Sequence, residues 1–310
     1  MGIIENLLGI KYPLFQGGMT MIANYKLVSA VSNAGGLGIL ASAGLTKDEL
    51  RAEIKKTKEL TKNPFAVNLM LMNKNIPELI DVIIEESVKI VSTGAGTPKP
   101  YMEKLKENNI KVIAVIPNVK VAKKMEDIGV DIVVAEGGES GGHVGETTTL
   151  SLVPQIVDAV NIPVIAAGGI ADGRGIAAAF SLGAKGVQLG TLFLTTEECV
   201  IPNSIKQAII DAVDTSTTVV GRQKGIPFRS IKNDILQKYY NLELGEGTKE
   251  DLDRLKNEAL SAAIVKGDSE NGLIMVGQIS GLITRIRPVK EVVETLFIEY
   301  NETIKKLQEI

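Results

Sequence analysis

Short apolar runs recur through the first two thirds of the chain, separated by segments with a helical spacing of apolar residues. Eight runs of three to five residues start 20 to 31 positions apart, at 13–15, 37–40, 65–69, 90–92, 112–116, 132–134, 163–166 and 187–189. The segments with helical periodicity are 47–60, 76–87, 98–108, 119–128, 150–160 and 172–182. Continuous apolar runs are typical of parallel strands that are covered on both faces. Eight such strands alternating with helices predict an α/β fold, a (β/α)8 TIM-type barrel.

A doubly wound open sheet is the alternative α/β fold. Such a sheet usually carries a GxGxxG turn after its first strand when it binds a dinucleotide. The early glycines of this chain, in Gly35-Gly36-Leu37-Gly38, do not have that spacing. The barrel is therefore the predicted architecture.

The apolar pattern changes after Leu194. Segments 205–213, 232–240 and 249–263 have helical character, 215–220 is β-branched and extended, and 245–247 is a candidate hinge. We predict a barrel over 1–200, a small lid or substrate subdomain over 201–280, and a closing helix over 281–310 that returns to the barrel. A separately folded domain is the weaker alternative, because no long linker precedes residue 201.

Composition excludes several classes of function. A net charge of −3 and a pI of about 5.5 disfavour a nucleic-acid binder, which would have a basic balance. Cys199 is the only cysteine, so neither an internal disulfide nor a cysteine metal cluster can form. The acidic neighbours of Cys199 predict an unreactive thiol.

The sequence gives no sign of membrane association. Residues 27–46 carry no charge, but they contain several serines and glycines, which indicates a buried helix, a turn and a strand. The N-terminal segment lacks a basic start followed by an apolar signal core. We expect a cytoplasmic protein with neither a membrane nor a nucleic acid as partner.

The only histidine of the chain, His143, lies in the glycine-dense loop 137–145, directly after the sixth predicted strand. Glycine allows main chain to approach a ligand closely. Any acid–base chemistry by histidine near neutral pH must use this residue. The other interpretation is a histidine in a structural turn.

Small polar residues and glycines follow most of the other predicted strands. In a TIM barrel the active site lies at these carboxyl ends, and the loops after strands seven and eight often bind phosphate. Here those loops contain Gly168-Gly169 and Gly190-Thr191. Sugar phosphates and flavin mononucleotide (FMN) are the leading ligands, and polar side chains suited to a flavin ring are those of Gln16, Asn68 and Gln188, with Met19. A single histidine without a companion histidine or cysteine predicts no zinc or iron site.

Five motifs, in order along the chain, together resemble the nitronate monooxygenase superfamily. They are Gln16-Gly17-Gly18-Met19, Phe65-Ala66-Val67-Asn68, Gly141-Gly142-His143-Val144-Gly145, Ala167-Gly168-Gly169-Ile170 and Gln188-Leu189-Gly190-Thr191. Within that superfamily the chain is most similar to the FabK-type enoyl-acyl-carrier-protein reductases, from Gly9 to about Gly281, including a late motif over 276–281.

The resemblance implies an FMN-dependent barrel enzyme of fatty-acid synthesis. NADH or NADPH would reduce the flavin, and hydride would pass to the β-carbon of a trans-2-enoyl thioester on acyl-carrier protein. His143 would protonate the α-carbon or hold the thioester carbonyl. The resemblance also implies a homodimer and a response to monovalent cations. The expected cofactor-binding residues are Gln16, Gly17, Gly18, Met19, Asn68, Glu136, Gly168, Gly169, Gln188, Gly190, Thr191, Met275, Gly277 and Gln278.

Two other functions stay open from the sequence. One is nitronate monooxygenase activity with O₂, in which His143 would contact the nitro compound. The other is a flavin-free phosphate-binding barrel that would use Glu136 and Glu139. Acyl-carrier protein is acidic, so a reductase should present basic residues near the site, and the candidates are Arg222, Lys224, Arg229 and Lys232. Apolar candidates for an acyl channel are Met19, Met21, Met70 and Met72.

Overall fold

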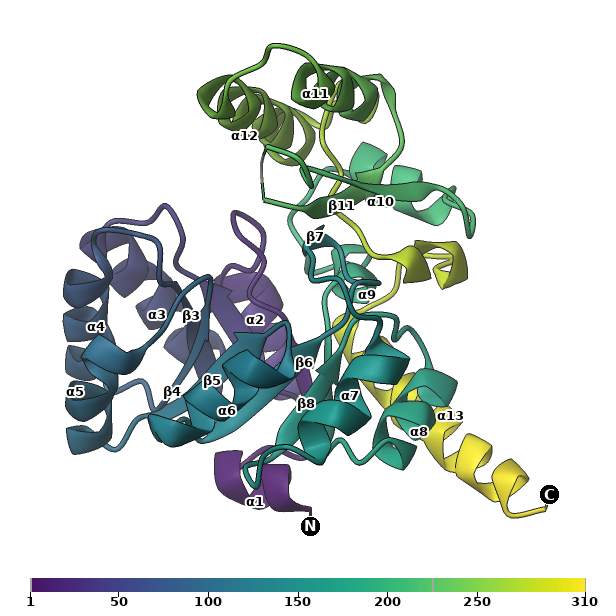
Figure 1. Cartoon of the computed structure of the whole chain (residues 1–310). Helices are drawn as coiled ribbons and strands as arrows, with labels where there is room; N and C mark the ends of the chain where they lie inside the picture. Colours follow the sequence, from purple (N-terminus) through teal and green to yellow (C-terminus); the bar gives the residue numbers. More distant parts are fainter. Residues whose placement is uncertain (1, 225, 310) are drawn as a thin grey trace.

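A closed parallel barrel forms the body of the molecule in the computed structural model, which describes residues 2–224 and 226–309 (Figure 1). The sheet order is β1-β9-β8-β6-β5-β4-β3-β2. Its strands are β1 (Leu14–Gln16), β2 (Gly38–Ala41), β3 (Phe65–Met70), β4 (Ile90–Gly94), β5 (Lys111–Ile116), β6 (Ile132–Glu136), β8 (Val164–Ala167) and β9 (Gly186–Leu189). The ring closes through a parallel bridge between Phe15 and Leu37, where the Leu37 N–H donates to the Leu14 carbonyl at 2.8 Å. The predicted TIM-type barrel is confirmed.

Helices cover the outside of the barrel. They are α2 (Tyr25–Asn33), α3 (Lys47–Leu60), α4 (Ile76–Glu85), α5 (Met102–Glu107, preceded by a 3-10 turn at Lys99–Tyr101), α6 (Val119–Asp127), α7 (Thr149–Val157) and α8 (Gly173–Ser181). The last helix, α13 (Val289–Leu307), packs against both α8 and α2 and so takes the eighth position in the ring. Gly173 permits this contact, because a Cβ there would collide with the backbone of Glu299 and Tyr300.

The strands bury both faces, as their continuous apolar runs predict. Alternate residues such as Ile132 and Val134 point into the barrel with Phe15, and helix α1 (Ile3–Leu8) packs against this inner cluster. The intervening residues, such as Val133 and Ala135, pack outward against the helices. Period-two alternation between two apolar environments explains why the strands show no polar face.

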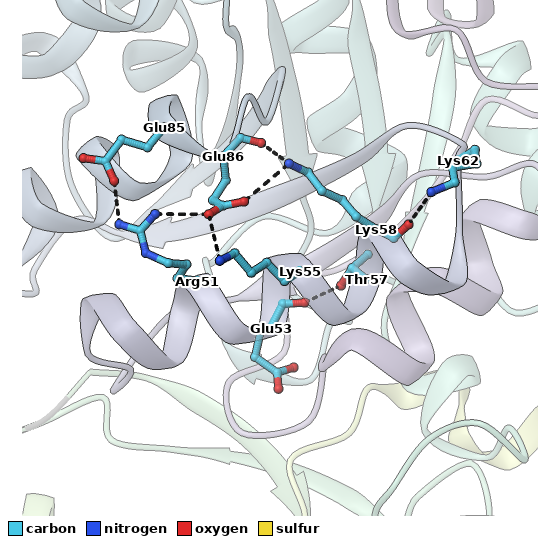
Figure 2. A network of polar contacts seen from close by, with 8 residues as sticks. All are labelled: Arg51, Glu53, Lys55, Thr57, Lys58, Lys62, Glu85 and Glu86. Atoms are coloured by element: carbon cyan, nitrogen blue, oxygen red, sulfur yellow. Dashed lines mark hydrogen bonds and ion pairs between the residues drawn. The ribbon is translucent and has the colours of Figure 1, made fainter.

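An ion-pair cluster joins two of the covering helices (Figure 2). Glu86, directly after α4, accepts Arg51 at 3.1 Å, Lys58 at 3.6 Å and Lys55 at 4.0 Å, all from α3. Glu85 pairs with the same guanidinium. The cluster fixes α3 against α4 and takes no part in the site.

A smaller subdomain lies beyond the carboxyl ends of the strands (Figure 1). It contains β10 (Thr217–Val220), β11 (Phe228–Ile231), α11 (Asp234–Leu244) and α12 (Lys249–Lys266). Its own apolar core consists of Val220, Phe228, Leu236, Tyr239, Leu252, Ala259 and Leu273. We call this unit, residues 217–275, the lid.

The segment between barrel and lid packs with the barrel. It holds α9 (Thr191–Leu194) and α10 (Asn203–Ile210), and Ile205 and Ile209 of α10 belong to the large barrel core. After the lid, a 3-10 helix at Gln278–Leu282 contacts both α9 and α10. The unit with its own core is therefore shorter than the predicted span of 201–280.

No helix within residues 2–224 and 226–309 has both the length and the apolar character needed to cross a membrane.

Candidate active site

The histidine loop is part of the lid sheet. Gly142 and His143 form a short strand, β7 (Gly142–His143), that pairs antiparallel with β11, with His143 opposite Phe228 and Gly142 opposite Arg229. The Val144 N–H also donates to the Pro227 carbonyl at 3.0 Å. Strand β7 lies where the end of the barrel meets the lid (Figure 1), and His143 is only partly covered there. Movement of the lid sheet must therefore move the imidazole.

Glu139 anchors the start of this loop on the barrel. Its carboxylate accepts the Thr149 N–H at 2.9 Å and lies 2.9 Å from the Thr149 hydroxyl, so it caps the N-terminus of α7. The Glu139 carbonyl accepts the Gln278 N–H at 2.9 Å, which ties the loop to the chain leaving the lid. A carboxylate held in this way has a structural role. This removes one of the two acids on which a flavin-free phosphate-binding barrel would depend.

Arg229 clamps the same loop from the lid side. Its side chain is buried, and its guanidinium donates to the Gly138 carbonyl at 2.9 Å and to the Thr217 hydroxyl at 3.1 Å. Burial lowers the pKa of Arg229, and the charge of Glu139 opposes that shift. From its sequence position, Arg229 was a candidate surface residue for binding acyl-carrier protein. The structure corrects this prediction, because the side chain is buried and not available to a partner. Lys224 is also engaged, because its ammonium donates to the Gly245 carbonyl.

Several of the predicted cofactor residues lie together at the strand ends. A Cβ on Gly18 would lie 2.6 Å from Cβ of Asn68, one on Gly17 would lie 3.6 Å from the Gln188 amide nitrogen, and one on Gly190 would lie 3.7 Å from the sulfur of Met19. The loops after β1, β3 and β9 therefore meet. Larger side chains than glycine at these positions would fill the space in front of Asn68 and Gln188.

Two buried polar atoms in this region have no hydrogen-bond partner among the described residues. They are Oε1 of Gln188, in β9, and the hydroxyl of Ser140, in the histidine loop. Unpaired buried polar atoms are costly unless a ligand or water satisfies them. An acceptor on Gln188 beside glycine backbone fits a flat ligand that has a ring N–H, as a flavin does.

Other predicted cofactor residues have their polar groups engaged within the protein. The buried Gln16 amide bonds the Ile39 backbone across the β1–β2 closure, with the Ile39 N–H 3.2 Å from Oε1. The Thr191 hydroxyl accepts the Gly277 N–H at 2.9 Å. Met275 packs against the lid core, and the Gln278 side chain is exposed. Gln16 and Thr191 thus stabilise the frame of the site.

The structure limits the places at the strand ends where a phosphate could bind. The N-terminus of α8 is already capped by carboxylates: Asp172 accepts the Arg174 and Gly175 N–H groups, and Glu299 accepts the Gly173 N–H at 3.0 Å. Arg174 pairs with Asp172 and not with the site. Gly168 and Gly169 both have positive φ, at 92° and 72°, a conformation that turns successive backbone groups inward without side chains. An anion would meet these glycine turns and not the end of α8.

Glu136, at the end of β6, is the titratable group most affected by burial. Loss of water raises its pKa to about 7. An acid with a raised pKa contributes stability that is fully present below its unfolded pKa, near 4.5, and is lost as the pH rises through about 7.

The raised pKa of Glu136 predicts that the stability of the protein falls as the pH rises. Between pH 5 and pH 8 the unfolding free energy of the wild type should fall by about 1–3 kcal/mol relative to that of Glu136→Gln. Urea titrations at both pH values measure the difference. Glu250→Gln, at an exposed position, is the matched control and should follow the wild type. Parallel pH profiles for wild type and Glu136→Gln would contradict the assignment.

The pKa of His143 is lowered from its usual value. The main cause is loss of surrounding water, followed by the positive charge of Lys256, and the negative charge of Asp253 opposes both. The imidazole is therefore neutral at neutral pH, with one N–H to donate and one nitrogen to accept.

The described residues include neither a metal-binding cluster nor an exposed thiol. Within the described residues no group of three or more His, Cys, Asp or Glu side chains is placed to hold a metal ion. Cys199 is buried, and burial raises the pKa of its thiol. The prediction of an unreactive thiol is consistent with this environment.

The fold and site define a TIM-barrel enzyme with a lid, with glycines at the ends of the strands and one histidine in the loop after β6 that pairs with the lid sheet. Comparison with known proteins gives the family. The nitronate monooxygenase family model matches residues 3–299, and the chain belongs to that family. It is accordingly a flavoprotein and an oxidoreductase.

Three relatives illustrate the range of the similarity. The structure of FabK from Thermotoga maritima is 42% identical, with a TM-score of 0.97 over 100% of this chain and 99% of that one. A (3aS,4S,5R,7aS)-5-hydroxy-7a-methyl-1-oxo-octahydro-1H-indene-4-carboxyl-CoA dehydrogenase of Rhodococcus jostii is 34% identical over 98% of this chain and 97% of its own. A probable nitronate monooxygenase of Staphylococcus saprophyticus is 39% identical over 76% of this chain and 79% of its own.

Two parts of the site were not predicted from the sequence: His143 was expected in a loop and not in a strand, and β11 was not expected. The helix expected over 249–263 is present as α12. The alternation in Phe228-Arg229-Ser230-Ile231 was a weak signal for a strand. A two-residue strand such as β7 has too few positions to show any periodicity.

Proposed function

We propose that the protein is an FMN-dependent enoyl-thioester reductase that uses NADH or NADPH, with acyl-carrier protein as the carrier of its substrate. The observation that carries the proposal is the full-length similarity to FabK, at 42% identity and a TM-score of 0.97. The neutral imidazole at the barrel mouth is compatible with this activity.

FMN fits the strand ends described above. Gln188 would accept a ring N–H through its unpaired Oε1, and Gly17, Gly18 and Asn68 would line the adjacent space. Gly168 and Gly169 would meet the phosphate with backbone groups. Bound FMN, once reduced by a nicotinamide cofactor, supplies hydride for the β-carbon of the substrate.

His143 has the role of a neutral hydrogen-bond donor. Hydride addition to an enoyl thioester places negative charge on the carbonyl oxygen, and a donor aimed at that oxygen stabilises the transition state. A neutral imidazole donates without first having to acquire a proton. The pH profile of activity should then contain a limb that follows the titration of His143, because the two protonation states of the imidazole differ in charge and in the number of N–H donors.

Oxidation of nitronates is the second candidate, and the family match and the Staphylococcus saprophyticus relative favour it. A nitronate is an anion with charge on its oxygens, so a neutral N–H donor at His143 would also bind it. The two activities differ in both the electron donor and the electron acceptor, but not in the sign of the charge that His143 must meet.

An anaerobic half-reaction experiment separates the two. The purified protein is mixed with NADH or NADPH, its visible spectrum is followed, and crotonyl thioester is then added without oxygen. Loss of the flavin absorbance followed by its recovery on addition of the thioester is the expected result. A flavin that resists both nicotinamides, is reduced by a nitronate and recovers only in air would overturn the proposal in favour of nitronate oxidation.

Arg222 tests the choice of carrier. It is exposed in the turn that precedes β11, and Glu243 holds that turn through the Gly221 and Gln223 N–H groups at 2.9 and 2.6 Å. Arg222→Glu should raise KM for an acyl-carrier-protein substrate about tenfold, because it places like charge against an acidic partner. KM for a small thioester should stay unchanged. Lys290→Glu, on the distant α13, is the control, and equal effects of Arg222→Glu on both substrates would contradict the carrier role.

A further inference from the structure

The lid helix α12 presents a lysine on its buried face. The buried residues of this helix, Leu252, Ala259 and Ala263, repeat at spacings of seven and four. Lys256 lies between the first two, four residues after Leu252 and three before Ala259, so it shares their face. Its side chain is only 14% exposed, and its ammonium lies 3.3 Å from the Asp253 carboxylate. Burying a charge costs free energy, so a lysine in the apolar stripe of a helix is unusual.

That face of α12 packs toward the strand that pairs with the histidine loop. Leu252 and Ala259 belong to the same apolar cluster as Phe228. Phe228 is the residue opposite His143 in the β7–β11 pair, and its ring meets Tyr239 edge-on with centroids 5.0 Å apart. Residues directly opposite in an antiparallel pair project to the same face, so the His143 side chain lies on the face of the lid sheet that Phe228 turns toward the cluster with Leu252 and Ala259.

We propose that Lys256 is a positioning residue for His143: its ammonium, held by Asp253 on the lid helix, keeps the active-site imidazole in its neutral, hydrogen-bond-donating form. Like charges nearby disfavour protonation of a histidine. Because β7 is a strand of the lid sheet, imidazole and ammonium belong to one unit, and lid movement need not separate them.

The other titratable groups on the elements around β7 either form contacts elsewhere or are largely uncharged. On β11, Arg229 bonds the Gly138 carbonyl, and at the start of the loop Glu139 caps α7. On α11, Tyr239 stays neutral because burial raises its pKa to about 12. Glu136, at the end of β6, is half neutral near pH 7. The charges that act on the imidazole are those of Lys256, which lowers the pKa of His143, and of Asp253, which raises it.

What the neutral imidazole does for the substrate rests on the proposed function, but its protonation can be measured without substrate. His143 is the only histidine in the sequence, so the flavin-loaded protein with ¹⁵N-labelled histidine gives one imidazole to titrate by NMR. Lys256→Met should raise the measured pKa of His143 by about half a unit. Asp253→Asn should lower it. Lys256→Arg, which keeps the charge, should restore the wild-type value.

Lys266→Met is the matched control, because it removes the same charge from an exposed position on the same helix. A His143 titration that is unmoved in Lys256→Met, or moved equally in Lys266→Met, would overturn the proposal. If Lys256→Met does not fold, Asp253→Asn decides: the carboxylate is half exposed, and a pKa that rises or stays constant contradicts the role of this pair.

A kinetic readout separates this inference from the proposed function. If the protein reduces enoyl thioesters, the limb of its pH profile that follows His143 should move to higher pH in Lys256→Met by the same amount as the pKa measured by NMR. If no enoyl reduction is found but the NMR shifts have the expected signs, the proposed function fails and the positioning role stands.

Discussion

His143→Ala should lower kcat/KM for enoyl-thioester reduction by about 10²–10³-fold, the effect of removing one donor from a developing oxyanion. The variant should fold and retain its flavin, because His143 is exposed and touches the lid sheet mainly through backbone. The limb of the pH profile that follows the titration of His143 should also disappear from the residual activity. Steady-state assays with crotonyl thioester between pH 5 and pH 8 measure both effects.

Glu146→Ala is the control for this variant, since Glu146 is an exposed side chain three residues further along the same loop. Retention of full activity by His143→Ala would refute the role assigned to the imidazole. A comparable loss in Glu146→Ala would show that the loop, and not the imidazole, limits the reaction.

Arg229→Met should both destabilise the protein and reduce its activity. The change leaves the partly buried Gly138 carbonyl without its guanidinium donor and removes the positive charge near Glu139. Loss of hydrogen bonds from a charged, buried donor predicts a decrease of about 3 kcal/mol in the free energy of unfolding. Because Gly138 begins the loop that carries His143, we also expect kcat to fall at least about tenfold through misplacement of the imidazole.

Arg254→Met supplies the comparison, because Arg254 is 69% exposed on the same lid. Chemical denaturation measures stability, and turnover at saturating thioester measures kcat. Stability and kcat within error of Arg254→Met would contradict the clamp. Unlike Arg222→Glu, the Arg229 variant should affect small and carrier-linked thioesters alike, since the buried guanidinium does not contact a carrier.

Arg229 and Arg222 have different roles in the structure, although the sequence placed both in one basic surface group. In the sequence both residues belong to one basic group that also includes Lys224 and Lys232. In the structure Arg229 lies inward on β11 and Arg222 outward in the preceding turn. Arg222 lies in an exposed turn and Arg229 in a paired strand, so residues of like charge and close number can have unrelated roles.

The strand ends were accessible to sequence reasoning for a clear physical reason. In a parallel barrel every strand runs in the same direction, so residues that follow different strands must meet at one end. Asn68, Gln188 and the glycines beside them were placed together by that rule, and the structure brings them into contact. The engagement of Gln16 with Ile39 was not accessible, because it depends on which strand closes the ring.

The sequence by itself determined the barrel, the cluster of glycines at its mouth and the presence of a single imidazole there. These follow from local periodicity and from the order of the strands, which a linear pattern records. Only the tertiary structure decided that Gly142 and His143 pair with β11, that Arg229 clamps their loop and that the face of α12 bearing Lys256 packs in the same lid core as Phe228. Periodicity reports that a face is buried, but not which distant segment buries it. That depends on the packing of the whole chain, so the electrostatic environment of His143 could be read only from the fold.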